Sequence, residues 1–400
     1  MIYSLKMNLS IYLHIPFCTK RCSYCDFNTY AGLENIISTY VQALCREIEI
    51  LGKKLPDSYR NKVHTIYFGG GTPSLLRPEE IKAILTFLKW HFGFTSDLEI
   101  TLEANPGTLN LAKVEGYGEV GVNRLSIGFQ AANERELQLL GRLHTLEDVV
   151  EAVRIARLAG VRNLNLDLIY GLPGQKLADW KNTLQVALSL QVEHLSLYSL
   201  TIEEGTLMDE WIRGGKLPYP DGDFAADCYE LAREMLAQYG YIHYEISNWA
   251  KPGEYGLNFC RHNLQYWKNR EYVGLGAGAH GFVGGFRLAN VLHPIQYIQK
   301  LSAPSNNDFP FTPATDNSRG VDREEEMKDT VMLGLRLVQD GVGDEDFYQR
   351  FGVRLKEVFP REITKLLRKG LVEWIATDQP RLRLTRFGQL LANQAFLEFV

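Results

Sequence analysis

The chain has 400 residues, a formal net charge of −5 and 45% apolar residues, which is close to an average soluble protein. This length accommodates one large domain and a smaller one, and the mild negative charge gives no sign of a nucleic-acid partner. No apolar run reaches the roughly 18 residues of a membrane span, the first residues lack the features of a signal peptide, and the cysteines are too sparse for a disulfide scaffold. These properties predict a reduced, cytoplasmic protein without a membrane span.

Through about residue 200, short β-rich runs alternate with stretches whose apolar residues recur at three- and four-residue spacing, as in amphipathic helices. The predicted strands are residues 10–15, 65–68, 98–103, 124–129, 163–170 and 194–200. A strand followed by a helix, repeated along the chain, predicts a parallel sheet with covering helices. We therefore expect an α/β fold built on a partial (β/α)6 barrel, and a flat doubly wound sheet is the alternative.

Each predicted strand runs into a loop that carries residues suited to chemistry. These stretches are 16–30, 69–73, 103–107, 129–130, 167–174 and 198–206. The carboxyl ends of the strands of a β/α barrel open on one face, and that face carries the functional site. The sequence thus predicts that all of these loops contribute to a single site.

The composition changes after residue 240. Aromatic, His, Asn and Gly residues crowd into 243–281, which predicts loops, while Pro, Ser and Asn in 301–318 predict a linker. From about residue 322, helical patterns followed by two short β-rich runs predict a mainly helical, winged-helix-like domain. The expected domains are a barrel core at 1–240, a segment completing the site at 241–300, a linker at 301–320 and a C-terminal domain at 321–400.

The glycine-rich stretch "GLGAGAHG" at 274–281 has neither the strand, the helix nor the downstream acid of a dinucleotide site, so it predicts close backbone packing. Three isolated cysteines, Cys45, Cys228 and Cys260, are expected to be small buried residues.

Three other cysteines, Cys18, Cys22 and Cys25, form a C-x3-C-x2-C motif. A zinc ion would require a fourth Cys or His nearby, and a disulfide would leave one thiol over. An iron–sulfur cube held by three thiolates leaves one iron free to bind a substrate or cofactor. We favour the iron–sulfur interpretation.

This motif, with Tyr24 before its last cysteine, and "GGGTP" at 69–73 resemble the radical S-adenosylmethionine enzymes. The resemblance implies a [4Fe–4S] cluster whose free iron takes the amino and carboxylate groups of S-adenosylmethionine. It also implies an electron donor, because reduction cleaves the cofactor to a 5′-deoxyadenosyl radical. The cofactor-binding residues that it implies are Tyr12, Tyr24, Gly70, Gly71, Thr72, Glu103, Gln130, Arg142 and Asp167. Tyr198 and Thr201, at the last strand end, are further candidates.

Further motifs along nearly the whole chain, among them "SIGFQ", "DLIYGLP" and "GLGAGAH", resemble the oxygen-independent coproporphyrinogen oxidase group. The oxidases proper carry a fourth cysteine where this chain has Phe27, and they have an N-terminal extension. The chain therefore resembles the sister group of HemW-type haem chaperones, which implies binding of haem and its transfer to apoproteins. The oxidase activity, and a radical enzyme for an unrelated substrate, remain alternatives.

The segment "HNLQYW" at 262–267 matches a motif of this group. The resemblance makes His262 the candidate ligand of the haem iron, since a neutral imidazole suits haem iron. The alternative is that His262 is hydrogen-bonded within a packed aromatic segment.

Overall fold

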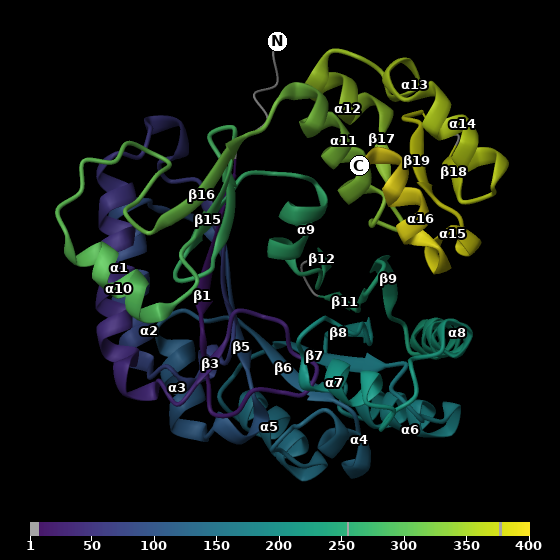
Figure 1. Ribbon diagram of the computed structural model, residues 1–400, viewed down its shortest axis with the longest axis horizontal. Coiled ribbons are helices and arrows are strands. Elements are labelled where there is room, and N and C mark those ends of the chain that lie inside the picture. Colours follow the sequence, from purple (N-terminus) through teal and green to yellow (C-terminus); the bar gives the residue numbers. More distant parts are fainter. Residues whose placement is uncertain (1–7, 254–255, 376–377) are drawn as a thin grey trace. The chain divides into compact units, whose positions relative to one another are not determined.

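The computed structural model describes residues 8–253, 256–375 and 378–400, which fall into two compact units (Figure 1). The barrel unit contains the described residues of 1–235 and 271–320, and the helical unit contains those of 236–270 and 321–400. Within these described ranges, no helix combines the length and the apolarity that crossing a bilayer requires.

Six strands of the barrel unit are parallel neighbours in chain order. They are β1 (Leu9–Ile15), β4 (Val63–Gly70), β5 (Phe94–Ala104), β6 (Arg124–Gln130), β7 (Asn163–Tyr170) and β8 (His194–Ser199). Every residue of β6 is buried, as expected for parallel strands that are covered on both faces.

Helices follow these strands along the chain and lie on the outer side of the sheet (Figure 1). They are α1 (Ile37–Lys53), α2 (Pro78–His91), α3 (Leu111–Glu119), α4 (Glu134–Leu139), α5 (Leu146–Leu158), α6 (Leu177–Ser189), α7 (Leu207–Arg213) and α8 (Gly222–Gln238). Each buries an apolar face; in α1 this face includes Tyr40, Leu44 and Leu51. The predicted α/β fold with a partial (β/α)6 barrel is confirmed.

The sheet continues beyond β1 with strands from much later in the chain. These are β13 (Tyr272–Leu275), which is parallel to β1, and the antiparallel strands β14 (His280–Val283), β15 (Phe286–Asn290) and β16 (Thr315–Gly320). Helix α10 (Pro294–Ser302) lies between β15 and β16. The expected linker at 301–320 is therefore wrong in its second half. Thr312 and Ala314 are buried, and Thr312 donates a hydrogen bond to Glu47. The backbone of β16 pairs with β15, so this part of the segment belongs to the sheet of the barrel unit.

The glycine-rich stretch at 274–281 does pack closely, as predicted, although it begins in the strand β13, which the sequence did not reveal. A Cβ atom on Gly276 would lie 2.6 Å from the backbone oxygen of His14, and one on Gly278 would lie 2.2 Å from Nδ2 of Asn28. Both glycines have positive φ angles, which other residues rarely adopt.

The helical unit has a core of its own, which includes Val331, Phe347, Phe359, Leu366 and Leu382. Its helices are α9 (Arg261–Trp267), α11 (Arg323–Gly334), α12 (Asp344–Phe351), α13 (Leu355–Val358), α14 (Pro360–Arg368), α15 (Arg386–Leu390) and α16 (Ala392–Phe396). Its three-stranded sheet has the order β17 (Val342–Gly343), β19 (Arg381–Leu384), β18 (Val372–Ile375). Helices followed by the β18–β19 hairpin give the expected winged-helix-like arrangement.

The boundaries of the two compact units differ from the boundaries of the expected domains. The segment 241–300 is shared between them: residues 271–300 belong to the barrel unit through β13–β15, whereas 241–270 belong to the helical unit. The physical reason is local pairing. The backbone of β13 pairs with β1, while Glu245 forms an ion pair with Arg336, and Asn269 donates a hydrogen bond to Thr330.

Candidate functional site

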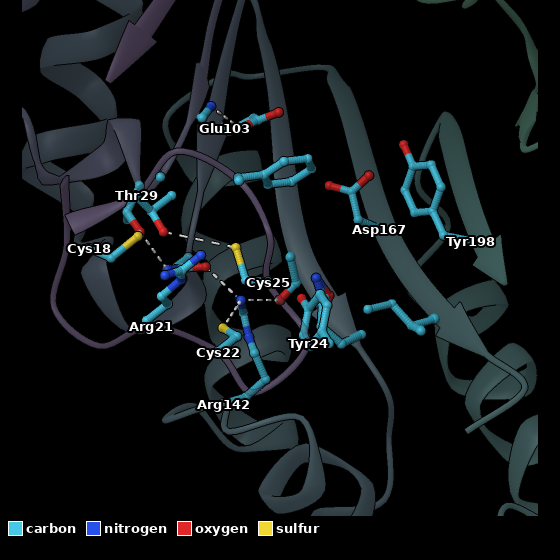
Figure 2. A pocket seen from close by; sticks show the side chains of 18 of the residues that line it. Cys18, Arg21, Cys22, Tyr24, Cys25, Thr29, Glu103, Arg142, Asp167 and Tyr198 are labelled. Carbon is cyan, nitrogen blue, oxygen red and sulfur yellow. Dashed lines mark hydrogen bonds between the residues drawn. The ribbon is translucent and has the colours of Figure 1, made fainter. Parts of the chain in front are cut away.

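A cavity of about 370 Å³ opens in the barrel unit at the carboxyl ends of β4–β8 (Figure 2). All of its lining residues lie between positions 18 and 203. They include the predicted site residues Cys18, Cys22, Tyr24, Cys25, Gly70, Gly71, Thr72, Glu103, Gln130, Arg142 and Asp167, and also Tyr198 and Thr201. The structure thus brings residues of each predicted loop region into one site, although residues 171–174 do not line the cavity, and neither do residues 271–300 of the expected segment 241–300.

Of the three cysteines of the motif, Cys18 ends the short strand β2 (Phe17–Cys18) and the other two follow in the next loop; each sulfur has a hydrogen-bonding partner (Figure 2). Thr72 Oγ1 donates to Cys18 Sγ at 3.6 Å and Arg142 Nη1 donates to Cys22 Sγ at 3.4 Å. Cys25 Sγ lies 4.0 Å from Thr29 Oγ1. Hydrogen bonds of this kind favour the thiolate, which is the form that ligates metals.

A chain of side chains joins two of these sulfurs. Arg142 Nη2 donates to Asn105 Oδ1 at 2.5 Å, and Asn105 Nδ2 donates to Thr72 Oγ1 at 2.9 Å. Asn105 was not predicted as a site residue, although its place in "EANPG", directly after a strand, was a usable signal. Arg142, predicted as a cofactor-binding residue, here contacts Cys22, Asn105 and the Gly128 carbonyl oxygen.

Burial raises the pKa of the Cys18 thiol to about 11 and also raises the pKa of Cys25. Without a cation, these thiols therefore keep their protons at neutral pH. A metal centre bound here has to displace those protons, and the adjacent guanidinium of Arg142 helps to compensate the negative charge that results.

The glycine loop after β4 is shaped by two close approaches. Gly70 has a φ of +114°, and a Cβ atom there would lie 2.6 Å from the ring of His14. A Cβ atom on Gly71 would lie 2.6 Å from the Phe17 carbonyl oxygen and 3.0 Å from Cys18 Sγ. The missing side chains thus let the loop lie directly against the cysteine loop and leave its backbone open to the cavity.

Two partly buried carboxylates line the cavity opposite the cysteines. Glu103 accepts hydrogen bonds from Tyr67 OH at 2.8 Å and from the Gly70 backbone N–H at 3.1 Å. Asp167 accepts from Ser126 Oγ at 2.8 Å and Asn165 Nδ2 at 2.9 Å. Burial raises the pKa of Glu103 to about 7, and it also raises the pKa of Asp167.

Gln130, at the end of β6, has a backbone conformation that few residues other than glycine adopt, with a φ of +63°. The pairing register between β6 and β7 shifts at this point. Its side chain is buried, and Oε1 accepts no hydrogen bond from the residues that the structure describes. A buried, unpaired amide oxygen in a cavity wall is suited to a donor group on a ligand.

Two predicted residues lie away from the cavity lining. Tyr12, on β1, bonds through its OH to His14 Nδ1 at 2.9 Å and stacks on Tyr67, so it contacts the residue that supports Glu103. His262 lies in α9 of the helical unit, where it is fully buried and bonds through Nε2 to Tyr266 OH at 2.8 Å.

Residues 12–187 match the Radical SAM superfamily, and residues 321–391 match the HemN C-terminal domain. The chain is 37% identical over 394 residues to "Heme chaperone HemW" of Bacillus subtilis, which covers 98% of this chain and 99% of that protein. The chain belongs to the HemW family.

Two further similar proteins and one solved structure support this assignment. "Heme chaperone HemW" of Escherichia coli is 39% identical over 76% of this chain and 79% of its own length. A mouse protein, "Radical S-adenosyl methionine domain-containing protein 1, mitochondrial", is 36% identical over 91% of this chain and 81% of its own length. The solved structure of coproporphyrinogen III oxidase (HemN) from E. coli superposes with a TM-score of 0.81 over 100% of this chain and 91% of that chain. At 23% identity, it shows the shared fold alone.

Proposed function

We propose that this HemW-family chain binds haem and transfers it to acceptor proteins, while it holds a [4Fe–4S] cluster and S-adenosylmethionine. The observation that carries the proposal is the 37% identity to a named haem chaperone over almost the full length of both chains. The cysteine-lined cavity supports the cluster and the cofactor independently of that name.

The residues present fit a cluster held by three thiolates. Three irons would be held by Cys18, Cys22 and Cys25, and the fourth iron would face the cavity. Each cysteine sulfur would keep the N–H or O–H partner described above. Arg142 would offset the negative charge of the thiolates. When bound and reduced, the cluster supplies an electron to S-adenosylmethionine.

The cavity also fits the cofactor. The backbone at Gly70 and Gly71 would receive its methionine end, where a side chain would collide with His14 or Phe17. Glu103 and Asp167 would accept hydrogen bonds from the ribose hydroxyls, and the unpaired Oε1 of Gln130 is a further acceptor.

The binding of S-adenosylmethionine should depend on pH through Glu103. With a pKa of about 7, Glu103 loses its charge as the pH falls, and only the carboxylate can accept a ribose hydroxyl at both oxygens. If the ionised form alone binds, the titration of Glu103 by itself should lower the affinity about tenfold between pH 8 and pH 6. Isothermal titration calorimetry of the anaerobically reconstituted protein measures this.

The cofactor's own amino group also titrates near pH 8 and must be unprotonated to bind iron. The test therefore compares the unchanged protein with Glu103→Gln, which should bind more weakly and with a shallower pH dependence. Glu204→Gln, an exposed carboxylate on the same unit, is the control and should keep the full dependence. Equal slopes in all three proteins would remove Glu103 from the proposed site.

The alternative function, oxygen-independent coproporphyrinogen III oxidase, shares the fold. Phe27 stands where the oxidases carry a further cysteine, and its side chain is 63% exposed at the cavity edge. An exposed phenyl ring cannot provide a thiol there, which supports the chaperone function.

We expect the protein to bind about one haem per chain. We also expect no conversion of coproporphyrinogen III to protoporphyrinogen IX in the presence of reductant and S-adenosylmethionine. Measurable decarboxylation would favour the oxidase.

The haem ligand needs a separate test, because His262 is buried and bonded to Tyr266. If His262 ligates the haem iron, this hydrogen bond must open first. Tyr266→Phe should then strengthen haem binding, and His262→Ala should weaken it and shift the absorption spectrum. His280, which is exposed on β14, is the matched comparison. A spectrum that changes with His280→Ala and not with His262→Ala would assign the ligand to His280.

Three further properties stay predictions of the sequence: an electron donor for the cluster, the absence of a nucleic-acid partner and a cytoplasmic location.

A further inference from the structure

Two of the three motif cysteines receive their hydrogen bonds from side chains that one asparagine holds. Asn105, directly after β5, accepts from Arg142 Nη2 at 2.5 Å and donates through Nδ2 to Thr72 Oγ1 at 2.9 Å. Arg142 in turn donates to Cys22 Sγ, and Thr72 donates to Cys18 Sγ. Asn105 is therefore connected to two sulfurs, through one intervening side chain in each case.

The asparagine amide decides where the hydroxyl proton of Thr72 points. A guanidinium group only donates hydrogen bonds, so the amide oxygen of Asn105 must face Arg142 and the amide nitrogen must face Thr72. A hydroxyl group has a single proton. Because Thr72 Oγ1 accepts the N–H of Asn105, its own proton is left to point at Cys18 Sγ. An acceptor in place of that N–H group would attract the proton away from the sulfur.

The same amide holds the guanidinium of Arg142 in place. Nη2 is bonded to Asn105 Oδ1 and to the Gly128 carbonyl oxygen, while Nη1 is directed at Cys22. A Cβ atom on Gly128 would lie 2.8 Å from Arg142 Nη2 and 3.5 Å from Asn105 Oδ1, so the glycine leaves room for this pair. Asn105 is itself fixed, because its carbonyl oxygen accepts from the backbone N–H and the hydroxyl group of Thr108 at 3.0 and 2.7 Å.

Hydrogen bonds to the cysteine sulfurs stabilise the reduced, more negative state of an iron–sulfur cluster, and they help to set its reduction potential. We propose that Asn105 is a positioning residue that raises the reduction potential of the cluster, acting through Thr72 on Cys18 and through Arg142 on Cys22. This inference rests on the cluster of the proposed function. It goes beyond that function, because it assigns a role to a residue outside the three ligands.

The test is a redox titration of the anaerobically reconstituted full chain without S-adenosylmethionine. Dithionite is the reductant, and the electron paramagnetic resonance signal of the reduced cluster gives the midpoint potential. Cys22, Asn105 and Arg142 also line another cavity, of about 280 Å³, and water admitted by a smaller side chain at 105 would itself change the potential. The variants Asn105→Asp and Asn105→Leu therefore keep the branched shape of asparagine. The midpoint does not depend on the fraction of chains that hold a cluster, so a variant that assembles incompletely still reports it.

Asn105→Asp should lower the midpoint by at least about 59 mV, a tenfold shift of a one-electron equilibrium. Its carboxylate draws the Thr72 proton away from Cys18 and also adds a negative charge. Asn105→Leu should lower the midpoint by less, because it leaves the Thr72 proton free to point at Cys18 while Arg142 loses one partner. Asn110→Asp is the matched control: it adds the same charge at an exposed helix N-cap, where aspartate caps as well as asparagine, and it should leave the midpoint unchanged.

A second background separates the hydrogen bond from the charge. Thr72→Val removes the hydroxyl group that Asn105 orients, so the shift caused by Asn105→Asp should be smaller in that background. Equal shifts in both backgrounds would mean that the new charge acts through space, which would overturn the proposal. Unchanged midpoints in both Asn105 variants would overturn it as well. Iron and sulfide analysis distinguishes these results from a failure of the proposed function, since an unchanged protein without a cluster would refute both.

Discussion

We expect the joint replacement of Cys18, Cys22 and Cys25 with alanine to remove the iron–sulfur cluster completely. The unchanged protein should contain about four irons and four sulfides per chain after anaerobic reconstitution. The three sulfurs lie together at the cavity, so the triple variant retains no thiolate there to hold the cluster. Iron and acid-labile sulfide analyses, together with the visible absorption spectrum, measure the loss.

Single replacements of the other cysteines provide the matched controls. Cys45, Cys228 and Cys260 are buried and are not lining residues of this cavity, so Cys45→Ala, Cys228→Ala and Cys260→Ala should each keep the full iron content. Circular dichroism should show that the triple variant is folded, because the barrel core does not include the three cysteines. Stoichiometric zinc without acid-labile sulfide in the unchanged protein would contradict the cluster assignment.

The second large effect is expected on stability, from Glu47 in α1. Its side chain is fully buried and accepts four hydrogen bonds. These come from Tyr297 OH at 2.7 Å, Gly276 N and Asn290 Nδ2 at 2.8 Å, and Thr312 Oγ1 at 3.0 Å. One carboxylate therefore ties α1 to β15, α10, the glycine-rich stretch and the segment before β16.

Glu47→Ala should lower the free energy of unfolding by at least about 4 kcal/mol, because each buried donor left unpaired costs about 1–3 kcal/mol. This is a large part of the roughly 5–15 kcal/mol that stabilises a typical protein. Glu49→Ala, in the same helix, is the control: Glu49 forms surface ion pairs with Arg46 and Lys53, which are worth at most about 1 kcal/mol. Urea denaturation followed by circular dichroism compares them, and equal midpoints would show that the buried network contributes little.

The sequence by itself determined the order of the elements and the chemistry of the site. Alternation of β-rich and helical runs is a local signal, so it predicted the parallel strands from β1 to β8 correctly. Because the carboxyl ends of such strands meet on one face, the loops that follow them had to meet as well. Cys18, Glu103 and Asp167 could therefore be assigned to one cavity before any distance was known.

Only the tertiary structure decided which side chains pair across the fold. Asn105 joins Arg142 to Thr72, and Tyr67 supports Glu103, through contacts between residues more than thirty positions apart. Glu47 falls on the apolar face of α1, a visible anomaly, but its partners lie more than two hundred residues away.

The same limit explains the corrections. Composition suggested a linker at 301–320 because Pro, Ser and Asn favour turns, yet backbone pairing between β15 and β16 places its second half in the sheet. The motif around His262 is readable in the sequence, whereas its burial and its bond to Tyr266 depend on how α9 packs. Local patterns determine secondary structure and the residue types of a site. Long-range packing determines which of those residues are exposed and which are paired.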